Sequence, residues 1–312
     1  MRVDLPTPVV AVLGGIFGVL VVSSLVVAVR RKRRPDRDDS ELRQRVRSWW
    51  IMAGVFTAAL LVSRNVSIAF LGFVSFLALK EYLSVIPTRR VDRRALFYAY
   101  CAIPVQYYWV ATEWYGMFAI FIPVYMFLLI PIRIVLVGET DGFLRSVGTV
   151  HWGLMTTVFS ISHAAYLLVL RTPGAPAGEG AGLLLYLVLL TQSNDVAQYV
   201  WGKSFGRRKI VPEVSPKKTW EGFLGGVATT TGLALALGSS LTPFEWWQMA
   251  VAGAGIGLFG FFGDVTISAL KRDLHIKDSG NLIPGHGGIL DRLDSLTYTA
   301  PLFFHYTYYL HY

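Results

Sequence analysis

Ten stretches of predominantly apolar residues constrain the fold of this 312-residue chain more than any other feature. A helix that crosses the hydrocarbon core of a membrane needs about 20 such residues. We therefore predict an all-α, polytopic integral membrane protein with about ten transmembrane helices. The predicted helices cover residues 8–29, 49–63, 66–86, 95–111, 116–137, 149–170, 182–201, 222–240, 247–270 and 293–310. The second is short and is expected to form a hairpin with the third around Arg64 and Asn65.

Composition supports a membrane protein and argues against disorder, collagen or a small disulfide scaffold. Hydrophobic residues make up 54% of the chain and charged residues 16%, whereas soluble domains carry roughly 25% charged residues. The single cysteine, Cys101, cannot form an intramolecular disulfide. The first apolar stretch is too long for a signal peptide, and a basic cluster rather than a cleavage site follows it, so we expect a retained helix.

The positive charges lie mainly on one side of the predicted membrane. The loops 30–48, 87–94, 138–148, 202–221 and 271–292 hold 9, 4, 1, 6 and 4 Lys and Arg residues, or 24 of the 29. Cytoplasmic loops carry such an excess. We therefore expect a multi-pass protein of the inner (cytoplasmic) membrane, with both termini outside. The net charge of +9 then reflects these loops and not nucleic-acid binding.

A nearly uncharged, flexible linker at residues 172–180 divides the chain into two predicted regions. Residues 1–180 form an N-terminal transmembrane region of about six helices. Residues 181–312 form a C-terminal catalytic region of about four helices, facing the cytoplasm. This second region holds almost every unusual polar group, including four carboxylates at Asp195, Asp264, Asp291 and Asp294.

An ionisable side chain within a membrane span is costly and usually marks a functional pathway. The alternative is a structural carboxylate paired with a nearby Lys or Arg, which fits Asp195 better than the others. Asp291 and Asp294 are three residues apart and so lie on one helix face. Two such carboxylates repel unless a cation lies between them, and oxygen ligands favour Mg²⁺. An N-terminal helix cap would explain one Asp but not a second in line with Asp264.

The neighbouring cytoplasmic loops, 202–226 and 271–294, are basic and rich in glycine. Glycine lets backbone N–H groups approach phosphate oxygens, and Lys and Arg neutralise them. Taken alone, Lys217 and Lys218 could equally contact anionic headgroups. The adjacent Thr219, in a turn that resembles a helix cap, favours phosphate binding. His286, between glycines, is either a phosphate contact, a proton carrier or a structural hub.

Other site types lack their motifs in the sequence. There is no GxxxxGK[ST] loop, no HExxH and no Cys/His cluster, which argues against a P-loop NTPase and a zinc site. His151, His163 and His305 lie in apolar stretches and are expected to be core residues.

The C-terminal region carries a long spaced pattern, S-x-L-K-R, then K-D-x-G, then I-P-x-H-G-G-x-x-D-R-x-D. Its residues are Ser268, Leu270, Lys271, Arg272, Lys277, Asp278, Gly280, Ile283, Pro284, His286, Gly287, Gly288, Asp291, Arg292 and Asp294. In this pattern the chain resembles the CDP-diacylglycerol synthase (phosphatidate cytidylyltransferase) family. The resemblance covers residues 190–296. Two departures, Ile267 in place of Glu and Gln198 in place of Ala, leave room for a divergent paralogue with another lipid or nucleotide preference.

The resemblance implies that phosphatidic acid attacks the α-phosphorus of CTP, giving CDP-diacylglycerol and pyrophosphate in phospholipid biosynthesis. It implies Mg²⁺ on Asp264, Asp291 and Asp294, with K⁺ as a candidate second cation. The expected catalytic residues are Asp264, Lys271, Arg272, Asp291, Asp294 and His286. The expected nucleotide- and phosphate-binding residues are Asp195, Ser215, Lys217, Lys218, Thr219 and Lys277. A homodimer is common in the family.

Two rival functions fit part of the pattern. A CTP-dependent lipid kinase would transfer the γ-phosphate and release CDP, but the complete HGGxxDRxD pattern argues against it. A lipid transporter without enzymatic activity would also place charges within spans. The charges, however, gather at one membrane face and no inverted repeat is visible.

Overall fold

The structure is a computed structural model, and it describes the chain except for residues 1–5, 34–38, 90–91, 172–179, 286 and 312. Within the described residues every regular element is a helix, and β-pairing is limited to two isolated bridges, Lys209 with Thr219 and Ile283 with Gly287. The predicted all-helical class is confirmed. The predicted linker lies almost entirely outside the described residues, and the domain boundary at residue 180 stays a prediction.

Each of the ten predicted stretches corresponds to a helix or to one continuous helical run. The single helices are α1 (Thr7–Arg33), α2 (Ser40–Val62), α3 (Arg64–Val85), α4 (Arg93–Ala111), α9 (Ala181–Phe205), α10 (Trp220–Leu241) and α11 (Trp246–Asp273). Two runs contain a π-helical turn: α5 (Tyr115–Ile120), η2 (Phe121–Met126) and α6 (Phe127–Val135), then α7 (Phe143–Leu154), η3 (Met155–Phe159) and α8 (Ser160–Leu167). The chain ends with α12 (Leu290–Leu293) and α13 (Leu296–His311).

Six of these helical runs are long and apolar enough to cross a membrane. They are Thr7–Arg33, Ser40–Val62, Arg64–Val85, Tyr115–Val135, Trp220–Leu241 and Trp246–Asp273. The other four predicted spans form helices but fall outside this set by length or composition. The structure thus supports an integral membrane protein, while the count of ten spans stays a prediction.

The helix boundaries show where polar sequence continues a helix beyond its apolar stretch. α2 begins at Ser40, well before the predicted start at residue 49, because the charged segment in between continues the helix. The predicted hairpin is confirmed, but its turn lies at Ser63, and Arg64 and Asn65 are the first residues of α3. Ser63 separates α2 from α3, and its side-chain oxygen accepts a hydrogen bond from the Val66 N–H at 3.2 Å, an N-cap for α3.

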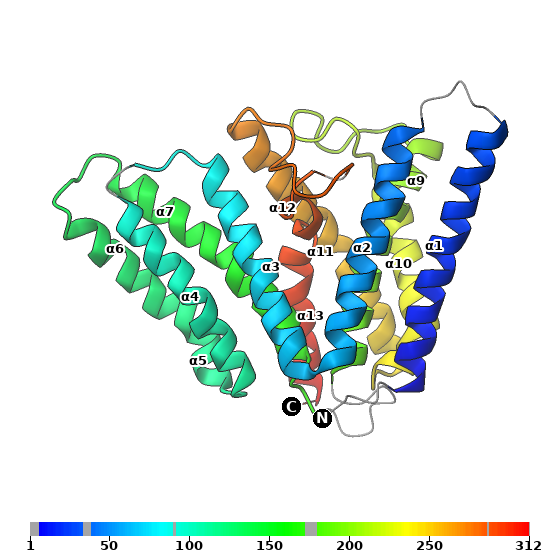
Figure 1. Cartoon of the computed structure of the whole chain (residues 1–312), viewed down its shortest axis with the longest axis horizontal. Helices are drawn as coiled ribbons and strands as arrows, with labels where there is room; N and C mark the ends of the chain where they lie inside the picture. The colour runs from blue at the N-terminus through cyan, green and yellow to red at the C-terminus, as the bar shows by residue number, and fades with distance from the viewer. Residues whose placement is uncertain (1–5, 34–38, 90–91, 172–179, 286, 312) are drawn as a thin grey trace.

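The helices form a bundle in which the C-terminal elements pack closely. α9, α10 and α11 contact one another, and α13 packs against α11 and α8 (Figure 1). α1 begins and α13 ends at one end of the bundle, whereas the loop after α9 and the loop after α11 lie at the other end (Figure 1). The predicted polar loops therefore gather at the end opposite the termini.

Glycines allow the close approach of the C-terminal helices. A Cβ at Gly257 of α11 would lie 2.9 Å from the Val227 Cα of α10. A Cβ at Gly263 would overlap the backbone carbonyl oxygen of Asp294. Because these positions lack a side chain, α11 contacts both α10 and the start of α13, and Asp264 is brought next to Asp294.

Candidate active site

A cavity of about 460 Å³ lies between α9, α11 and the loop that leads into α10. Its lining combines Lys side chains, carboxylates and two aromatic rings. The lining residues are Asp195, Gln198, Tyr199, Gly202, Lys203, Lys209, Ser215, Lys217, Lys218, Thr219, Gly222, Phe223 and Asp264. Such a mixture suits a ligand that carries both anionic groups and a flat ring.

The loop that leads into α10 is held by a helix cap, as the sequence indicates. Thr219 is buried, and its hydroxyl oxygen accepts a hydrogen bond from the Gly222 N–H at 3.2 Å. Glu221 accepts hydrogen bonds from the backbone N–H groups of Arg207 at 2.9 Å and Arg208 at 3.3 Å. These contacts fix the loop against the start of α10 and so place Lys217 and Lys218 at the cavity.

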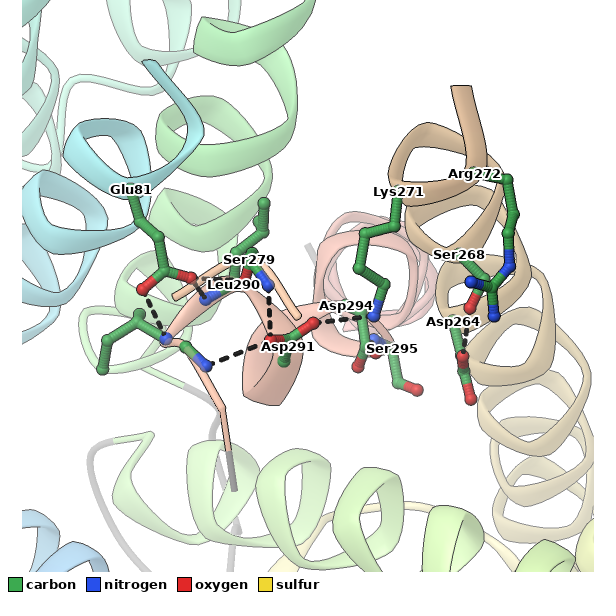
Figure 2. Close-up of polar contacts among 12 residues, drawn as sticks. Glu81, Asp264, Ser268, Lys271, Arg272, Ser279, Leu290, Asp291, Asp294 and Ser295 are labelled. Atoms are coloured by element: carbon green, nitrogen blue, oxygen red, sulfur yellow. Dashed lines mark hydrogen bonds and ion pairs between the residues drawn. The ribbon is translucent and has the colours of Figure 1, made fainter. Parts of the chain in front are cut away.

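Lys218 is the most constrained cation of the cavity. Its Nζ lies 2.6 Å from Asp264 Oδ2 and donates to Gln198 Oε1 at 2.9 Å. The same ammonium lies 5.4 Å from the centre of the Phe261 ring. Asp264 also accepts a hydrogen bond from Ser268 Oγ at 3.2 Å (Figure 2). The side chains of Lys218 and Asp264 are 18% and 24% exposed, so this ion pair remains open to a ligand.

A second group of polar side chains, at the start of α13, adjoins the cavity through Asp195. Ser295 Oγ donates to Asp195 Oδ1, and the Ser295 backbone N–H donates to Asp294 Oδ1, both at 2.8 Å. Asp195, Asp264 and Asp294 are close enough for their charges to repel one another. The fold therefore brings two of the predicted metal ligands, Asp264 and Asp294, close to Asp195.

Asp291, the third predicted metal ligand, makes a different set of contacts. Its Oδ1 lies 2.7 Å from Lys271 Nζ, and its Oδ2 accepts hydrogen bonds from the backbone N–H groups of Ser279 at 2.9 Å and Gly288 at 3.0 Å (Figure 2). Burial raises the pKa of Asp291, but the bond from Lys271 and the backbone donors outweigh it and lower the pKa below its usual value. Asp291 thus fixes the loop between α11 and α12.

The remaining predicted site residues lie around these clusters. Ser215 and Lys217 line the cavity, as predicted. Arg272 is exposed and donates through Nε to the Val214 carbonyl at 3.1 Å, which ties the end of α11 to the loop before α10. Lys277 is exposed and is not part of the cavity lining. His286 lies outside the described residues.

The carboxylates at the predicted magnesium site differ in how many of their oxygens are available to a cation. The carboxylates of Asp195 and Asp294 each accept one hydrogen bond, from Ser295, and within the described residues no bond is made to the second carboxylate oxygen of either. Carboxylate oxygens are the ligands that Mg²⁺ prefers. Both oxygens of Asp291 already accept bonds, however, and no group of three or more His, Cys, Asp or Glu side chains in the described part of the chain is arranged around a single point. Among the described residues, Asp195 and Asp294 each keep one carboxylate oxygen without a bond, whereas both oxygens of Asp264 are bonded, to Lys218 and Ser268. The assignment of Mg²⁺ to Asp264, Asp291 and Asp294 stays a prediction.

Sequence reasoning missed one acidic residue of this region, Glu81 of α3. The carboxylate of Glu81 accepts hydrogen bonds from the loop that carries Asp291 (Figure 2). The sequence does contain a sign of its role, because an acidic residue inside the predicted span 66–86 is as costly as one in the C-terminal spans. The recognised motifs all lie in the C-terminal helices, however, and none of them points to Glu81.

Comparison with known proteins places the chain in a family. The model of the Cytidylyltransferase family matches residues 43–310. The chain belongs to the cytidylyltransferase family. The match includes α2 to α13 and so covers both predicted regions, not only the motif-bearing C-terminal one.

Individual relatives of this cytidylyltransferase family member differ in how far the similarity extends. The chain is 44% identical to the uncharacterized protein YnbB of Escherichia coli over 294 residues, 94% of this chain and 96% of that protein. It is 41% identical to the phosphatidate cytidylyltransferase of Haemophilus influenzae over 141 residues, 42% of this chain and 47% of that enzyme. It is 27% identical to the phosphatidate cytidylyltransferase of Staphylococcus haemolyticus over 80% of this chain and 92% of that enzyme.

Proposed function

We propose that the protein is a membrane-embedded phosphatidate cytidylyltransferase, which converts CTP and phosphatidic acid to CDP-diacylglycerol and pyrophosphate. The observation that supports this most is the cavity in which Lys218 pairs with Asp264 beside Lys217, Lys203 and Lys209. A nucleoside triphosphate carries about four negative charges, and a cavity lined by four lysines and aromatic rings complements such a ligand. The family relationship supports CTP as the nucleotide.

In this proposal the residues of the cavity bind the triphosphate and align its α-phosphorus. Lys218 would exchange its bond to Asp264 for a phosphate oxygen, while Lys217 and Lys209 neutralise the remaining phosphates. Tyr199 and Phe223 offer ring faces to the cytosine. A phosphate monoester is already a nucleophile near neutral pH, so positioning and charge stabilisation suffice without a strong general base.

A magnesium ion, when bound, would supply charge neutralisation at the phosphates. Asp264 and Asp294 would hold it, with Asp195 as a further carboxylate and Asp291 as the other sequence-predicted ligand. A second, monovalent cation such as K⁺ remains part of the proposal. Ser295 would orient both Asp195 and Asp294, because it donates to each of them.

The location of the site fits a reaction between a soluble nucleotide and a membrane lipid. The cavity lies at the end of the bundle that holds the basic loops, and we propose that this end faces the cytoplasm, with the termini outside. Phosphatidic acid would enter from the bilayer with its headgroup at the level of Asp264.

The experiment that tests this function supplies the purified protein in detergent micelles with phosphatidic acid, Mg²⁺ and CTP labelled on either the α- or the γ-phosphate. Transfer of the α-label to lipid with release of γ-labelled pyrophosphate is expected. Transfer of the γ-label would instead identify a lipid kinase. Absence of any transfer with phosphatidic acid, followed by α-label transfer to another lipid phosphate, would identify a paralogue with a different acceptor.

A further inference from the structure

We propose that Glu81 of α3 is a positioning residue that holds the loop between α11 and α12 in its active shape. The N-terminal helices would then complete a site whose recognised motifs all lie in the C-terminal helices. The kinetic part of this inference rests on the proposed function, whereas the structural part can be tested without it.

Glu81 makes three hydrogen bonds to a segment that lies about 200 residues further along the chain. Its Oε1 accepts from Ser279 Oγ and from the Leu290 backbone N–H at 3.0 Å, and its Oε2 accepts from the Ile289 backbone N–H at 2.9 Å. Figure 2 shows this carboxylate reaching from α3 towards Ser279 and Leu290. Glu81 thus joins Ser279, within the loop, to Leu290 at the start of α12.

Burial makes these hydrogen bonds costly to lose. Glu81 is 9% exposed and Ser279 is 3% exposed. A buried polar group that loses its partner is destabilising, and more so if it is charged. Among the described residues Glu81 forms no ion pair, so the three donors of the loop are what compensate its burial.

Ser279 links Glu81 directly to Asp291. The Ser279 hydroxyl donates to Glu81, while its backbone N–H donates to Asp291 Oδ2 at 2.9 Å. Asp291 in turn pairs with Lys271 at 2.7 Å. A shift of the loop away from Glu81 would therefore move Asp291 and Lys271 as well, although Glu81 itself lies outside the cavity lining.

Two glycines of the loop are explained by the same carboxylate. A Cβ at Gly280 would lie 2.6 Å from Glu81 Oε2, and a Cβ at Gly288 would overlap Glu81 Oε1. From the sequence, the glycines of this loop were expected to approach phosphate oxygens. At these two positions the structure gives a different reason, because glycine is what lets the loop backbone approach Glu81.

The contacts require a carboxylate at this position. Both oxygens of Glu81 accept, so an amide would place its NH₂ group against a donor of the loop. Aspartate is one methylene shorter and would lose reach to the loop. Glu81→Gln is therefore a nearly isosteric change that weakens the contacts to the loop, because it keeps one accepting oxygen and replaces the other by a donor. Lys80→Gln on the same helix turn is a matched control because Lys80 is exposed.

The first measurement follows the loop and does not depend on the reaction. Leu282, which is 57% exposed in this loop, is replaced by Cys and spin-labelled in a Cys101→Ser background. We expect the Glu81→Gln variant to give a more mobile spectrum than the parent and Lys80→Gln to leave the spectrum unchanged. Equal spectra in all three proteins would overturn the proposed hold on the loop.

The second measurement compares the kinetics of cytidylyl transfer. A misplacement of about 1 Å far from the reacting atoms can cost about 100-fold in rate. We expect Glu81→Gln to lower kcat by about 10- to 100-fold with KM for CTP changed less than about 3-fold, because the cavity lysines are not attached to this loop segment. A lowered thermal stability with kcat unchanged would show a purely structural role and overturn the proposal.

A gentler variant keeps the test decisive if Glu81→Gln does not fold. Ser279→Ala removes one of the three hydrogen bonds and leaves the backbone contacts to Asp291 in place. We expect it to lower kcat in the same direction by about 3- to 10-fold, and an unchanged kcat in a folded protein would contradict the proposal. If the parent protein itself transfers no label, the proposed function fails, while the spin-label comparison still decides the role of Glu81.

Discussion

The helices α9 to α13 and the helices α1 to α8 are built on different packing principles. The C-terminal helices approach one another through glycines such as Gly257 and Gly263, and this brings Asp264 next to Asp294. In the earlier helices, glycines such as Gly153 instead face an aromatic side chain, here the buried ring of Tyr82. Close backbone approach places polar groups where a small ligand can bridge them, whereas aromatic packing provides a rigid support. Through Glu81 of α3, the N-terminal helices contact the segment that carries Asp291.

Replacing a carboxylate in each region gives the largest expected difference. Asp294→Asn removes a charge from the cluster beside Asp264 and should lower cytidylyl transfer by about 100- to 1,000-fold, the range for a group that stabilises charge in a transition state. The matched change Glu139→Gln, at an exposed acid of the N-terminal region, should leave turnover within about 2-fold of wild type. Both are measured by label transfer and checked for folding by size-exclusion chromatography. Near-normal turnover in Asp294→Asn would remove Asp294 from the proposed metal site.

Two glycines of one helix test the packing comparison directly. A Cβ at Gly263 would overlap the Asp294 carbonyl, whereas no atom lies within 4 Å of a Cβ at Gly255. We expect Gly263→Ala to lower the free energy of unfolding by about 1–3 kcal/mol, the usual cost of overpacking. Gly255→Ala should be neutral or slightly stabilising, since alanine favours helix. Thermal unfolding of the two variants in detergent measures the difference, and equal melting temperatures would contradict close packing at Gly263.

A buried side-chain amide in the cavity, that of Gln198, can show which substrate binds there. Gln198 is 5% exposed and lines the cavity, and its Oε1 accepts from Lys218. Its Nε2 has no hydrogen-bond partner among the described residues. A ligand that accepts this bond would explain the unpaired donor, so Gln198→Ala should raise KM for one of the two substrates by about 10-fold. Separate titrations of CTP and phosphatidic acid identify which substrate it contacts, and unchanged KM values for both would exclude a direct contact.

The smallest expected effect is the acid sensitivity of the Lys271–Asp291 pair. Because the folded state lowers the pKa of Asp291, ionised Asp291 adds stability above its ordinary pKa of about 3.9. That contribution is lost as the pH falls through the lowered folded-state pKa. In Lys271→Met the pKa should be less depressed, so the stability gap between wild type and variant should narrow as the pH falls from 6 to 3. Melting temperatures across that range check the sign, and a gap that widens in acid would contradict it.

The sequence predicted the helices well because each apolar stretch is a local property. The ten stretches all form helical runs, and the turn at Ser63 and the cap at Thr219 followed from neighbouring residues. The start of α2 was placed too late because a charged segment gave no sign that it continues a helix.

The site was predicted less completely because its contacts join distant parts of the chain. The spacing of Asp291 and Asp294 indicated one shared cation. Asp291 lies in α12 and Asp294 directly follows it, yet the two carboxylates enter different networks. The pairing of Lys218 with Asp264 depends on how α9, α10 and α11 pack, which no local pattern specifies. Glu81 lies 198 residues from its partner Ser279, and only the folded structure brings them together.

The central claim is that the cluster around Asp264 carries out cytidylyl transfer, and one measurement tests it most directly. Transfer of α-labelled CTP to phosphatidic acid is compared between wild type, Asp264→Asn, and Asp273→Asn, a change at an exposed acid of the same helix. The account predicts transfer by wild type and Asp273→Asn, and a loss of at least about 100-fold in folded Asp264→Asn. Equal transfer by all three proteins would contradict it.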